Sequence, residues 1–270
     1  MNIIFEKVKR SLRYYYYGKK NGWYFPSDIA HISGGKMAQG SYEPSITQTV
    51  KENLKSGDIF IDVGANIGYF SRLASDIVGP AGNVYSFEVD IENYYALLKN
   101  INDHLNVNAL HLAVADTNSF RTVYHSTHSA CHSLLNTKNH LDGKQFSIPT
   151  TTIDNFWETY LQRKPIQLIK IDVEGAELML LDGMDKIMNE NKINTMILEF
   201  VPEIIKNVDI TIERLYEKMA SHFTISIIES EHKSILKNGI IDNLSELKTL
   251  TKYLLERKEA NIVNLLCTKN

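Results

Sequence analysis

The chain has 270 residues, of which 43% are apolar and 23% charged, an ordinary globular composition that can bury a sizeable core. Its net charge of −3 and pI near 6.3 do not predict a nucleic-acid-binding protein. The two cysteines form no disulfide framework, no apolar run reaches the roughly 18 residues of a membrane helix, and no signal-peptide core is visible, so we expect a cytoplasmic location.

Residues 1–45 differ in composition from the rest of the chain. The run MNIIFEKVKRSLRYYYYGKKNGWYF places lysines and arginines beside Tyr14–Tyr17 and Trp23. One interpretation is a basic, aromatic segment over residues 1–25 that contacts a membrane surface peripherally. The other, which we favour, is an N-terminal helix packed on the main domain through its aromatic side chains, because basic helix faces are commonly just solvated. We predict an extension over residues 1–45 and one domain over residues 46–270.

A regular alternation of strand and helix patterns begins near residue 57. The apolar runs predict strands over 58–63, 83–89, 108–116, 166–173, 195–201, 223–229 and 260–268. The helix-period stretches predict helices up to Val78, over 93–105 and 176–190, and near 210–221. Such alternation indicates a parallel sheet covered on both faces. The late strands, with little predicted helix between them, indicate an antiparallel pair at one edge.

The first strand leads into DVGANIG, residues 62–68, at the sheet end where α/β proteins bind ligands. Gly64 and Gly68 allow close approach of the backbone to a ligand. The run is not GxGxxG, and Asp62 would repel a phosphate, which disfavours a nicotinamide dehydrogenase. Glu88, after the second strand, suits a ribose diol. Turn and acid together predict a nucleoside without phosphate, the character of S-adenosylmethionine.

Both acids also have a purely structural interpretation. Asp62 could be satisfied by backbone N–H groups at the start of a helix. Glu88 could be an acid at a strand end that faces solvent.

Five motifs occur in an order that resembles the FkbM-type methyltransferases. They are GSYEP (40–44), GDIFIDVGANIGYFS (57–71), NVYSFEVD (83–90), TTIDNF (151–156) and IKIDVEGAEL (169–178). The resemblance covers roughly residues 40–205 and implies a class I, S-adenosylmethionine-dependent fold, a Rossmann-like three-layer sandwich with a mostly parallel sheet and an antiparallel edge strand. Several members methylate hydroxyls of sugars or polyketides. Val89 departs from the proline that the family often has.

The resemblance also implies a cofactor site. The turn after the first strand would lie under the methionine end of S-adenosylmethionine, through Asp62, Gly64, Ala65, Asn66 and Gly68. Glu88, with Val89, would contact the ribose. Ala113 and Val114 would flank the adenine, Glu43 would form a further wall, and Asp172 would lie where cofactor and acceptor meet.

The run IKIDVEGAE, residues 169–177, supplies the candidate catalytic groups. Strand alternation puts Lys170 and Asp172 on one face. Asp172 is our first candidate for a base or an acceptor-orienting group and Glu174 the second. We interpret Glu177 as structural, because an acid at a helix start favourably meets the dipole. Lys170 would pair with a nearby acid and limit the cost of desolvation.

Two groups of residues raise the question of a metal site. Asp172 and Glu199 could share a divalent cation through oxygen ligands, but no spacing requires it, and we do not expect a metal. The connection YHSTHSACHSLLNTKNH carries His125, His128, His132 and His140 beside Cys131, with spacings that match no common zinc ligand set. We expect this long connection to cover the acceptor pocket. The resemblance implies that His132 and Ser133 contact the acceptor, and His132 is an alternative base. For each histidine, exposure on the surface or packing within the loop is the default interpretation.

The leading prediction is an O-methyltransferase that acts on a hydroxyl of a sugar, glycan or small metabolite, with no nucleic-acid partner. A second hypothesis keeps the cofactor and methylates nitrogen, although no NPPY-like motif is present. A third is a non-catalytic binding module with the same fold. The set of Asp62, Gly64, Gly68, Glu88 and Asp172 argues against the third, because a scaffold has no need of it.

Overall fold

The computed structural model describes residues 22–25, 34–126, 132–136, 141–202, 212–229, 232–257 and 262–270. Residues 1–21, His128, Cys131 and His140, interpreted above from the sequence, are not among the described residues. Within the described ranges, no helix combines the length and the apolar character needed to cross a membrane.

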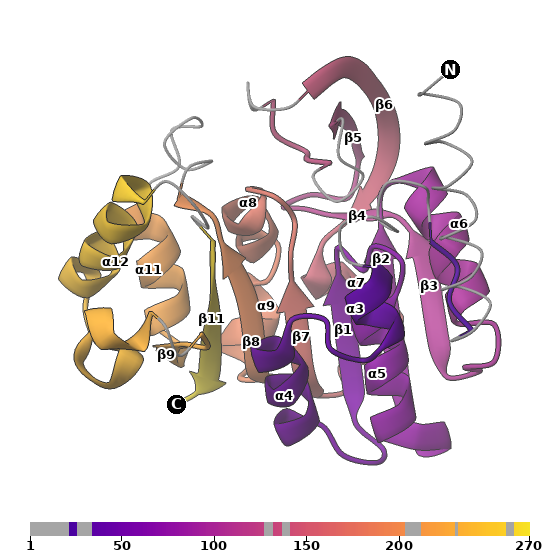
Figure 1. Cartoon of the computed structure of the whole chain (residues 1–270), viewed down its shortest axis with the longest axis horizontal. Helices are drawn as coiled ribbons and strands as arrows, with labels where there is room; N and C mark the ends of the chain where they lie inside the picture. Colours follow the sequence, from indigo (N-terminus) through magenta and orange to yellow (C-terminus); the bar gives the residue numbers. More distant parts are fainter. Residues whose placement is uncertain are drawn as a thin grey trace.

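A large mixed sheet organises the described chain (Figure 1). Its strand order is β10-β9-β11-β8-β7-β1-β2-β3. The strands are β1 (Ile59–Val63), β2 (Asn83–Glu88), β3 (Val107–His111), β7 (Ile166–Ile171), β8 (Ile193–Phe200), β9 (Phe223–Ile227), β10 (Ile240–Ile241) and β11 (Val263–Lys269). Pairing is parallel from β3 to β8. The strand β11 runs antiparallel to both β8 and β9, and the edge strand β10 is antiparallel to β9.

The sheet is the middle of three layers, as strand alternation predicts. Phe60, Leu168 and Ile197 belong to a core with α4 (Pro44–Asn53) and α5 (Tyr69–Val78). Their strand neighbours, such as Ile61 and Ile169, belong to the core on the opposite face. That face is covered by α7 (Ile153–Thr159), α8 (Glu177–Asp182), α9 (Asp185–Asn189), α11 (Ile212–Ala220) and α12 (Leu244–Glu256). The helix α6 (Ile91–Asn100) packs on the other face with α5, in the core that contains Ala96. The predicted class I fold is confirmed.

Two predicted elements are divided in the structure. The helix expected over 176–190 is two short helices, α8 and α9, which meet at Gly183. A Cβ there would lie 2.2 Å from the carbonyl oxygen of Ala115, so only glycine permits this close approach. The strand expected over 108–116 divides into β3 and the short β4 (Ala113–Val114).

A second, smaller sheet stands over one end of the large one (Figure 1). It has the order β4-β6-β5, with β5 (Phe120–Ser126) antiparallel to β6 (Leu141–Thr151) and β4 parallel to β6. The sequence predicted only an irregular covering connection here. Because β4 follows directly from β3, the small sheet lies beyond the carboxyl ends of the parallel strands.

The described parts of residues 1–45 pack on the α5 side of the large sheet. Phe25 and Met37 are buried in the same core as α4 and α5. The side chain of Asn100 on α6 accepts from the Tyr24 backbone N–H at 2.6 Å and donates to its carbonyl at 2.9 Å. The short helix α3 (Gly34–Ala38) then leads towards a pocket at the carboxyl ends of the parallel strands, which Met37 lines.

Candidate active site

A pocket opens where β1, β2, β7 and β8 end beneath the small sheet. Its empty volume, including the part open to solvent, is about 1030 Å³. Most predicted site residues line it: Glu43, Gly64, Ala65, Asn66, Glu88, Val89, Ala113, Val114, His132, Asp172 and Glu174. Glu199, considered from the sequence as a partner of Asp172 for a cation, lines it as well. The lining also contains residues to which the sequence assigned no site role or only an indirect one: Met37, Tyr42, Tyr69, Phe70, Asn93, Leu112, Leu134 and Lys170.

Two predicted cofactor residues do not line the pocket. Asp62 is buried behind it, where its carboxylate accepts from the Ser71 hydroxyl at 2.6 Å. Gly68, in the left-handed region with φ of 88°, forms the N-cap of α5, and a Cβ there would lie 2.5 Å from Leu97. The expectation of direct ligand contact is therefore corrected for both: Asp62 belongs to a buried polar layer and Gly68 to the packing of α5 on α6.

Gly64 is needed where two strand ends meet. Its φ is +78°, and a Cβ would lie 1.8 Å from the carbonyl oxygen of Asp172. The Asp172 backbone N–H in turn donates to the Val63 carbonyl at 3.0 Å. The glycine thus lets the turn after β1 lie directly against the backbone that carries Asp172.

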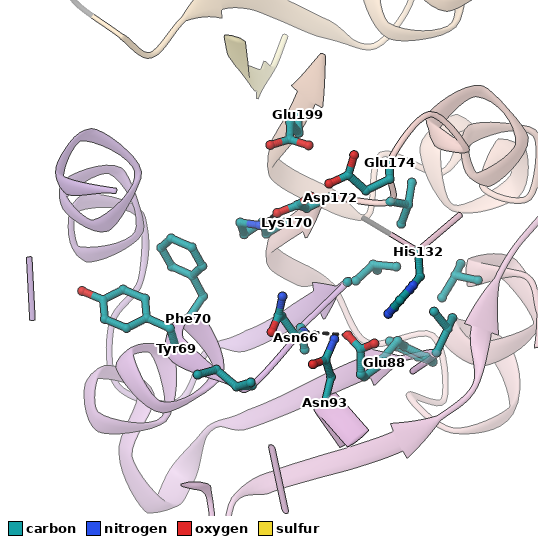
Figure 2. Close-up of a pocket in the computed structure, with 18 of the residues that line it drawn as sticks. Asn66, Tyr69, Phe70, Glu88, Asn93, His132, Lys170, Asp172, Glu174 and Glu199 are labelled. Carbon is teal, nitrogen blue, oxygen red and sulfur yellow. Dashed lines mark hydrogen bonds and ion pairs between the residues drawn. The ribbon is translucent and has the colours of Figure 1, made fainter. Parts of the chain in front are cut away.

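Glu88 forms one end of the pocket. It does not face bulk solvent, because it is buried and both carboxylate oxygens accept backbone N–H groups. The Asn66 N–H donates to one at 2.7 Å (Figure 2), and the Asp90 N–H donates to the other at 2.8 Å. Burial raises the pKa of the Glu88 carboxyl to about 7, although these hydrogen bonds oppose the shift. Each oxygen keeps a further lone pair, so the carboxylate can still accept hydroxyl groups of a ligand.

Lys170 and Asp172 form the centre of the other end (Figure 2). The ammonium of Lys170 lies 2.7 Å from Asp172 Oδ2, which confirms the expected pairing; the lysine side chain is 3% exposed and that of Asp172 27%. Burial disfavours the charged form of Lys170, but the charges of Asp172, Glu43 and Asp62 outweigh it and raise the pKa of the ammonium. The buried ammonium of Lys170 therefore offsets the negative charge of several neighbouring carboxylates.

Glu43, at the start of α4, also lies close to Lys170 and Asp172. It precedes α4 with a left-handed φ of 40°, an unusual conformation for a side chain other than glycine or asparagine. Burial raises the pKa of Glu43, while the charge of Lys170 opposes that shift. Burial and the neighbouring carboxylate of Glu43 also raise the pKa of the Tyr42 hydroxyl. Glu43 thus belongs to the acidic end of the pocket, and Tyr42 remains a neutral donor beside it.

Glu199 joins Asp172 and Glu174 at the ends of neighbouring strands. One oxygen from each of the three carboxylates lies within 4.8 Å of the others, an arrangement that could hold a divalent cation. Burial, followed by the charges of Asp172 and Glu174, raises the pKa of Glu199 well above its usual range. In Figure 2 Glu199, Glu174, Asp172 and Lys170 gather on one side of the pocket, across from Glu88.

The ring of His132 is tied to the Glu88 end. Its Nδ1 accepts from the Ser126 backbone N–H at 3.0 Å, and its Nε2 lies 3.4 Å from Asp90 Oδ2. Because Nδ1 uses its lone pair to accept this hydrogen bond, the neutral ring carries its hydrogen on Nε2. Neither ring nitrogen then has a lone pair available to take a proton from a methyl-acceptor hydroxyl. The expectation that His132 is an alternative base is therefore corrected to a role in positioning.

The same contacts bear on metal binding near His132. Ligand atoms of Asp90, His125 and His132 lie within 4.8 Å of one another. A histidine that binds a metal normally donates its other ring N–H to an acceptor. The Nδ1 of His132 instead accepts a backbone N–H, which opposes metal binding through Nε2.

Glu177 has the structural role expected of it. It is buried at the start of α8, and its Oε1 accepts from the Gly175 backbone N–H at 2.9 Å. Burial raises the pKa of Glu177 to about 7. Its carboxyl group therefore holds the turn that presents Asp172 and Glu174.

With this geometry established, comparison with known proteins assigns a family. Residues 62–231, well over half of the chain, match the model of the family described as Methyltransferase FkbM domain. None of the curated proteins compared with the chain matches it.

Solved structures with a similar course of chain include the following three. An rRNA methylase from Streptococcus thermophilus is 11% identical, with 83% of this chain and 93% of that chain covered and a TM-score of 0.46. An O-methyltransferase from Thermotoga maritima is 12% identical, with 91% of this chain and 72% of that chain covered and a TM-score of 0.44. Fibrillarin from Aeropyrum pernix, with bound S-adenosyl-L-methionine, is 12% identical, with 83% of this chain and 73% of that chain covered and a TM-score of 0.42. We draw no acceptor and no residue role from these likenesses.

Proposed function

Since the chain belongs to the FkbM methyltransferase family, we propose that it transfers a methyl group to a hydroxyl oxygen of a sugar, a glycan or another small hydroxylated metabolite. It is an S-adenosylmethionine-dependent methyltransferase, and the proposal concerns the acceptor and the residues that act on it. The observation that carries the proposal is a pocket with Glu88 at one end and the Lys170–Asp172 pair at the other.

The residues at the Glu88 end fit the nucleoside part of the cofactor. Glu88 offers carboxylate oxygens for a ribose diol, and the Gly64 turn brings backbone close to the ligand without a Cβ. An apolar wall suited to an adenine ring is formed by Val89, Leu112, Ala113, Val114 and Leu134. Within the described lining no arginine is present that would receive a phosphate, which agrees with a cofactor that has none.

When bound, the cofactor supplies an electrophilic methyl group on a sulfonium. Transfer forms a carbon–oxygen bond, breaks the carbon–sulfur bond and releases the hydroxyl proton. Asp172 is our candidate to orient the hydroxyl and accept that proton, because its side chain is 27% exposed at the pocket while Lys170 holds its Oδ2. Glu174 and Glu199 surround this position and would hold further hydroxyl groups of a polyol.

The acceptor is tested by incubating the protein with S-adenosylmethionine and panels of free sugars, glycans and small alcohols, each beside its amino analogue. We expect S-adenosylhomocysteine release with hydroxyl acceptors and an O-methyl product by mass spectrometry and NMR. Methylation of the amino analogues at nitrogen, with the hydroxyl compounds inert, would contradict the proposal.

Turnover is expected to survive treatment with EDTA followed by gel filtration. Lys170 already places a positive charge 2.7 Å from Asp172, so the carboxylate needs no metal to be held in place. The measurement is the rate of methyl transfer before and after chelation. Loss of activity that Mg²⁺ restores would show instead that Asp172, Glu174 and Glu199 hold a cation.

Affinity for S-adenosylhomocysteine is expected to fall as the pH drops below about 7. The pKa of Glu88 is raised to about 7, and the protonated carboxyl accepts ribose hydroxyls poorly. Below that pH Kd should rise by about tenfold per pH unit, and above it Kd should level off. Calorimetry over pH 5.5–8.5 measures this.

The matched variants for that experiment are Glu88→Gln and Glu92→Gln. A glutamine side chain does not titrate, so in Glu88→Gln the slope should disappear and the affinity should be weaker throughout. Glu92 is exposed on α6, and its variant should behave like the unmodified protein. Equal Kd at all pH values in the unmodified protein would remove Glu88 from the ribose site.

A further inference from the structure

A short segment of the histidine-rich connection, residues 132–135, fastens the two ends of the pocket to each other. His132 and Leu134 line the pocket, while Ser133 between them is buried. The backbone of Ser133 forms a bridge with Tyr124 on β5, through hydrogen bonds of 2.8 and 3.3 Å. The segment is therefore attached to the small sheet above the pocket.

The Ser133 side chain reaches the turn that carries the acidic residues. Its hydroxyl donates to the Glu174 carbonyl at 2.8 Å and accepts from the Leu135 backbone N–H at 3.0 Å. The second bond occupies a lone pair of the hydroxyl oxygen and favours the orientation in which its hydrogen points at Glu174. A serine in a covering segment thus holds the main chain of a candidate catalytic turn from outside.

That turn has a backbone conformation that needs support. Glu174 has a φ of 51° and Gly175 a φ of 96°, so two consecutive residues lie in the left-handed region. A non-glycine residue there is strained and persists when its surroundings fix it. The fixed points are the Ser133 hydroxyl on the Glu174 carbonyl and the Glu177 carboxyl on the Gly175 N–H. Loss of the first would free Glu174 to leave this conformation.

The residue next to Ser133 reaches the opposite end. His132 Nε2 lies 3.4 Å from Asp90, and the Asp90 backbone N–H donates to Glu88 at 2.8 Å. The same Asp90 carboxylate caps α6 through the N–H groups of Glu92 and Asn93, both at 2.9 Å. A continuous series of contacts therefore runs from Glu88 through Asp90, His132 and Ser133 to Glu174.

We propose that Ser133 is a positioning residue, which transmits occupancy of the Glu88 end to the Glu174 turn and so sets the acceptor site after the cofactor has bound. The inference rests on the proposed function, because it takes Glu88 as the ribose end and Glu174 as part of the acceptor end. In this scheme Ser133 touches neither ligand, in contrast to the acceptor contact expected from the sequence. Its effect is exerted through the Glu174 carbonyl.

Hydrogen–deuterium exchange on the full chain, with and without S-adenosylhomocysteine, tests the coupling. In the unmodified protein the ligand should slow exchange both in peptides over 88–93 and in peptides over 173–177. In Ser133→Ala the first protection should remain and Kd should stay close to that of the unmodified protein. Exchange over 173–177 should be at least tenfold faster and should no longer respond to the ligand.

Ser147→Ala is the matched control, because Ser147 is exposed on β6 of the same small sheet. It should exchange like the unmodified protein. With an acceptor from the screen, Ser133→Ala should lower kcat/KM for the acceptor at least tenfold while the melting temperature falls by only a few degrees, the effect of losing the hydroxyl's buried hydrogen bonds. A merely structural serine would change the melting temperature without this loss of kcat/KM.

Two results would overturn the inference. One is ligand protection over 173–177 that is equal in Ser133→Ala and the unmodified protein. The other is a folded Ser133→Ala that no longer binds S-adenosylhomocysteine, which would make Ser133 part of the cofactor site. Failure of the unmodified protein to bind the ligand would instead refute the proposed function, and exchange over 173–177 in the unliganded variants would still report on Ser133.

Discussion

Asp172→Asn is expected to lower turnover by about 10²–10⁴-fold, the usual contribution of a general base, with little change in the affinity for S-adenosylhomocysteine. The asparagine keeps the shape and one oxygen for Lys170 but cannot accept the acceptor proton. The substitution therefore separates chemistry from cofactor binding.

The measurement combines steady-state turnover with calorimetric titration of S-adenosylhomocysteine. Asp103→Asn, an exposed position after α6, is the control and should retain full turnover. Unchanged turnover in Asp172→Asn would remove this carboxylate from the reaction. Loss of cofactor affinity in parallel with turnover would make Asp172 mainly a cofactor ligand.

Lys170→Met is expected to destabilise the fold by about 3–5 kcal/mol, the usual cost of removing one partner of a buried ion pair. Lys170 is the cation that faces Asp172, Glu43 and the buried Asp62, and methionine keeps its length and apolar stem without the charge. At about 2–4 °C per kcal/mol for a domain of this size, the melting temperature should fall by roughly 6–20 °C.

Thermal unfolding followed by circular dichroism gives this measurement. Lys186→Met is the control, because Lys186 is paired with Glu158 on the surface and such pairs contribute little. The double variant Lys170→Met with Asp172→Asn should recover part of the lost stability, since it also removes one unpaired carboxylate. A melting temperature of Lys170→Met equal to that of the unmodified protein would contradict the assigned role of this lysine.

The fold could be predicted because its strands follow elementary rules. Runs such as IFIDV and IQLIKI are buried on both faces, as central parallel strands must be, and their alternation placed Lys170 and Asp172 on one side of the sheet. The covering strands β5 and β6 were not predicted. Their sequence is polar, and they pair only within the small sheet, so they have no buried face of their own in the large one. Tertiary contact at Gly183 divided the helix expected over 176–190.

The site was most predictable where residues follow strands in a motif. Glu88, Gly64 and Asp172 line the pocket as expected, but Asp62, in the same motif as Gly64, is buried behind the pocket. Tyr42 is brought to the pocket just before α4, and although it lies in the GSYEP motif, only its neighbour Glu43 could be selected from the sequence. The removal of His132 from the candidate bases depends on a backbone N–H of Ser126, which no sequence pattern reveals.

Calorimetric titration of the purified protein with S-adenosylhomocysteine at pH 8, beside Glu88→Gln, tests the central assignment most directly. We expect one binding site per chain with micromolar affinity, weakened in the variant while the protein remains folded. A folded, unmodified protein that binds neither S-adenosylhomocysteine nor S-adenosylmethionine would contradict the assignment of this pocket as the cofactor site.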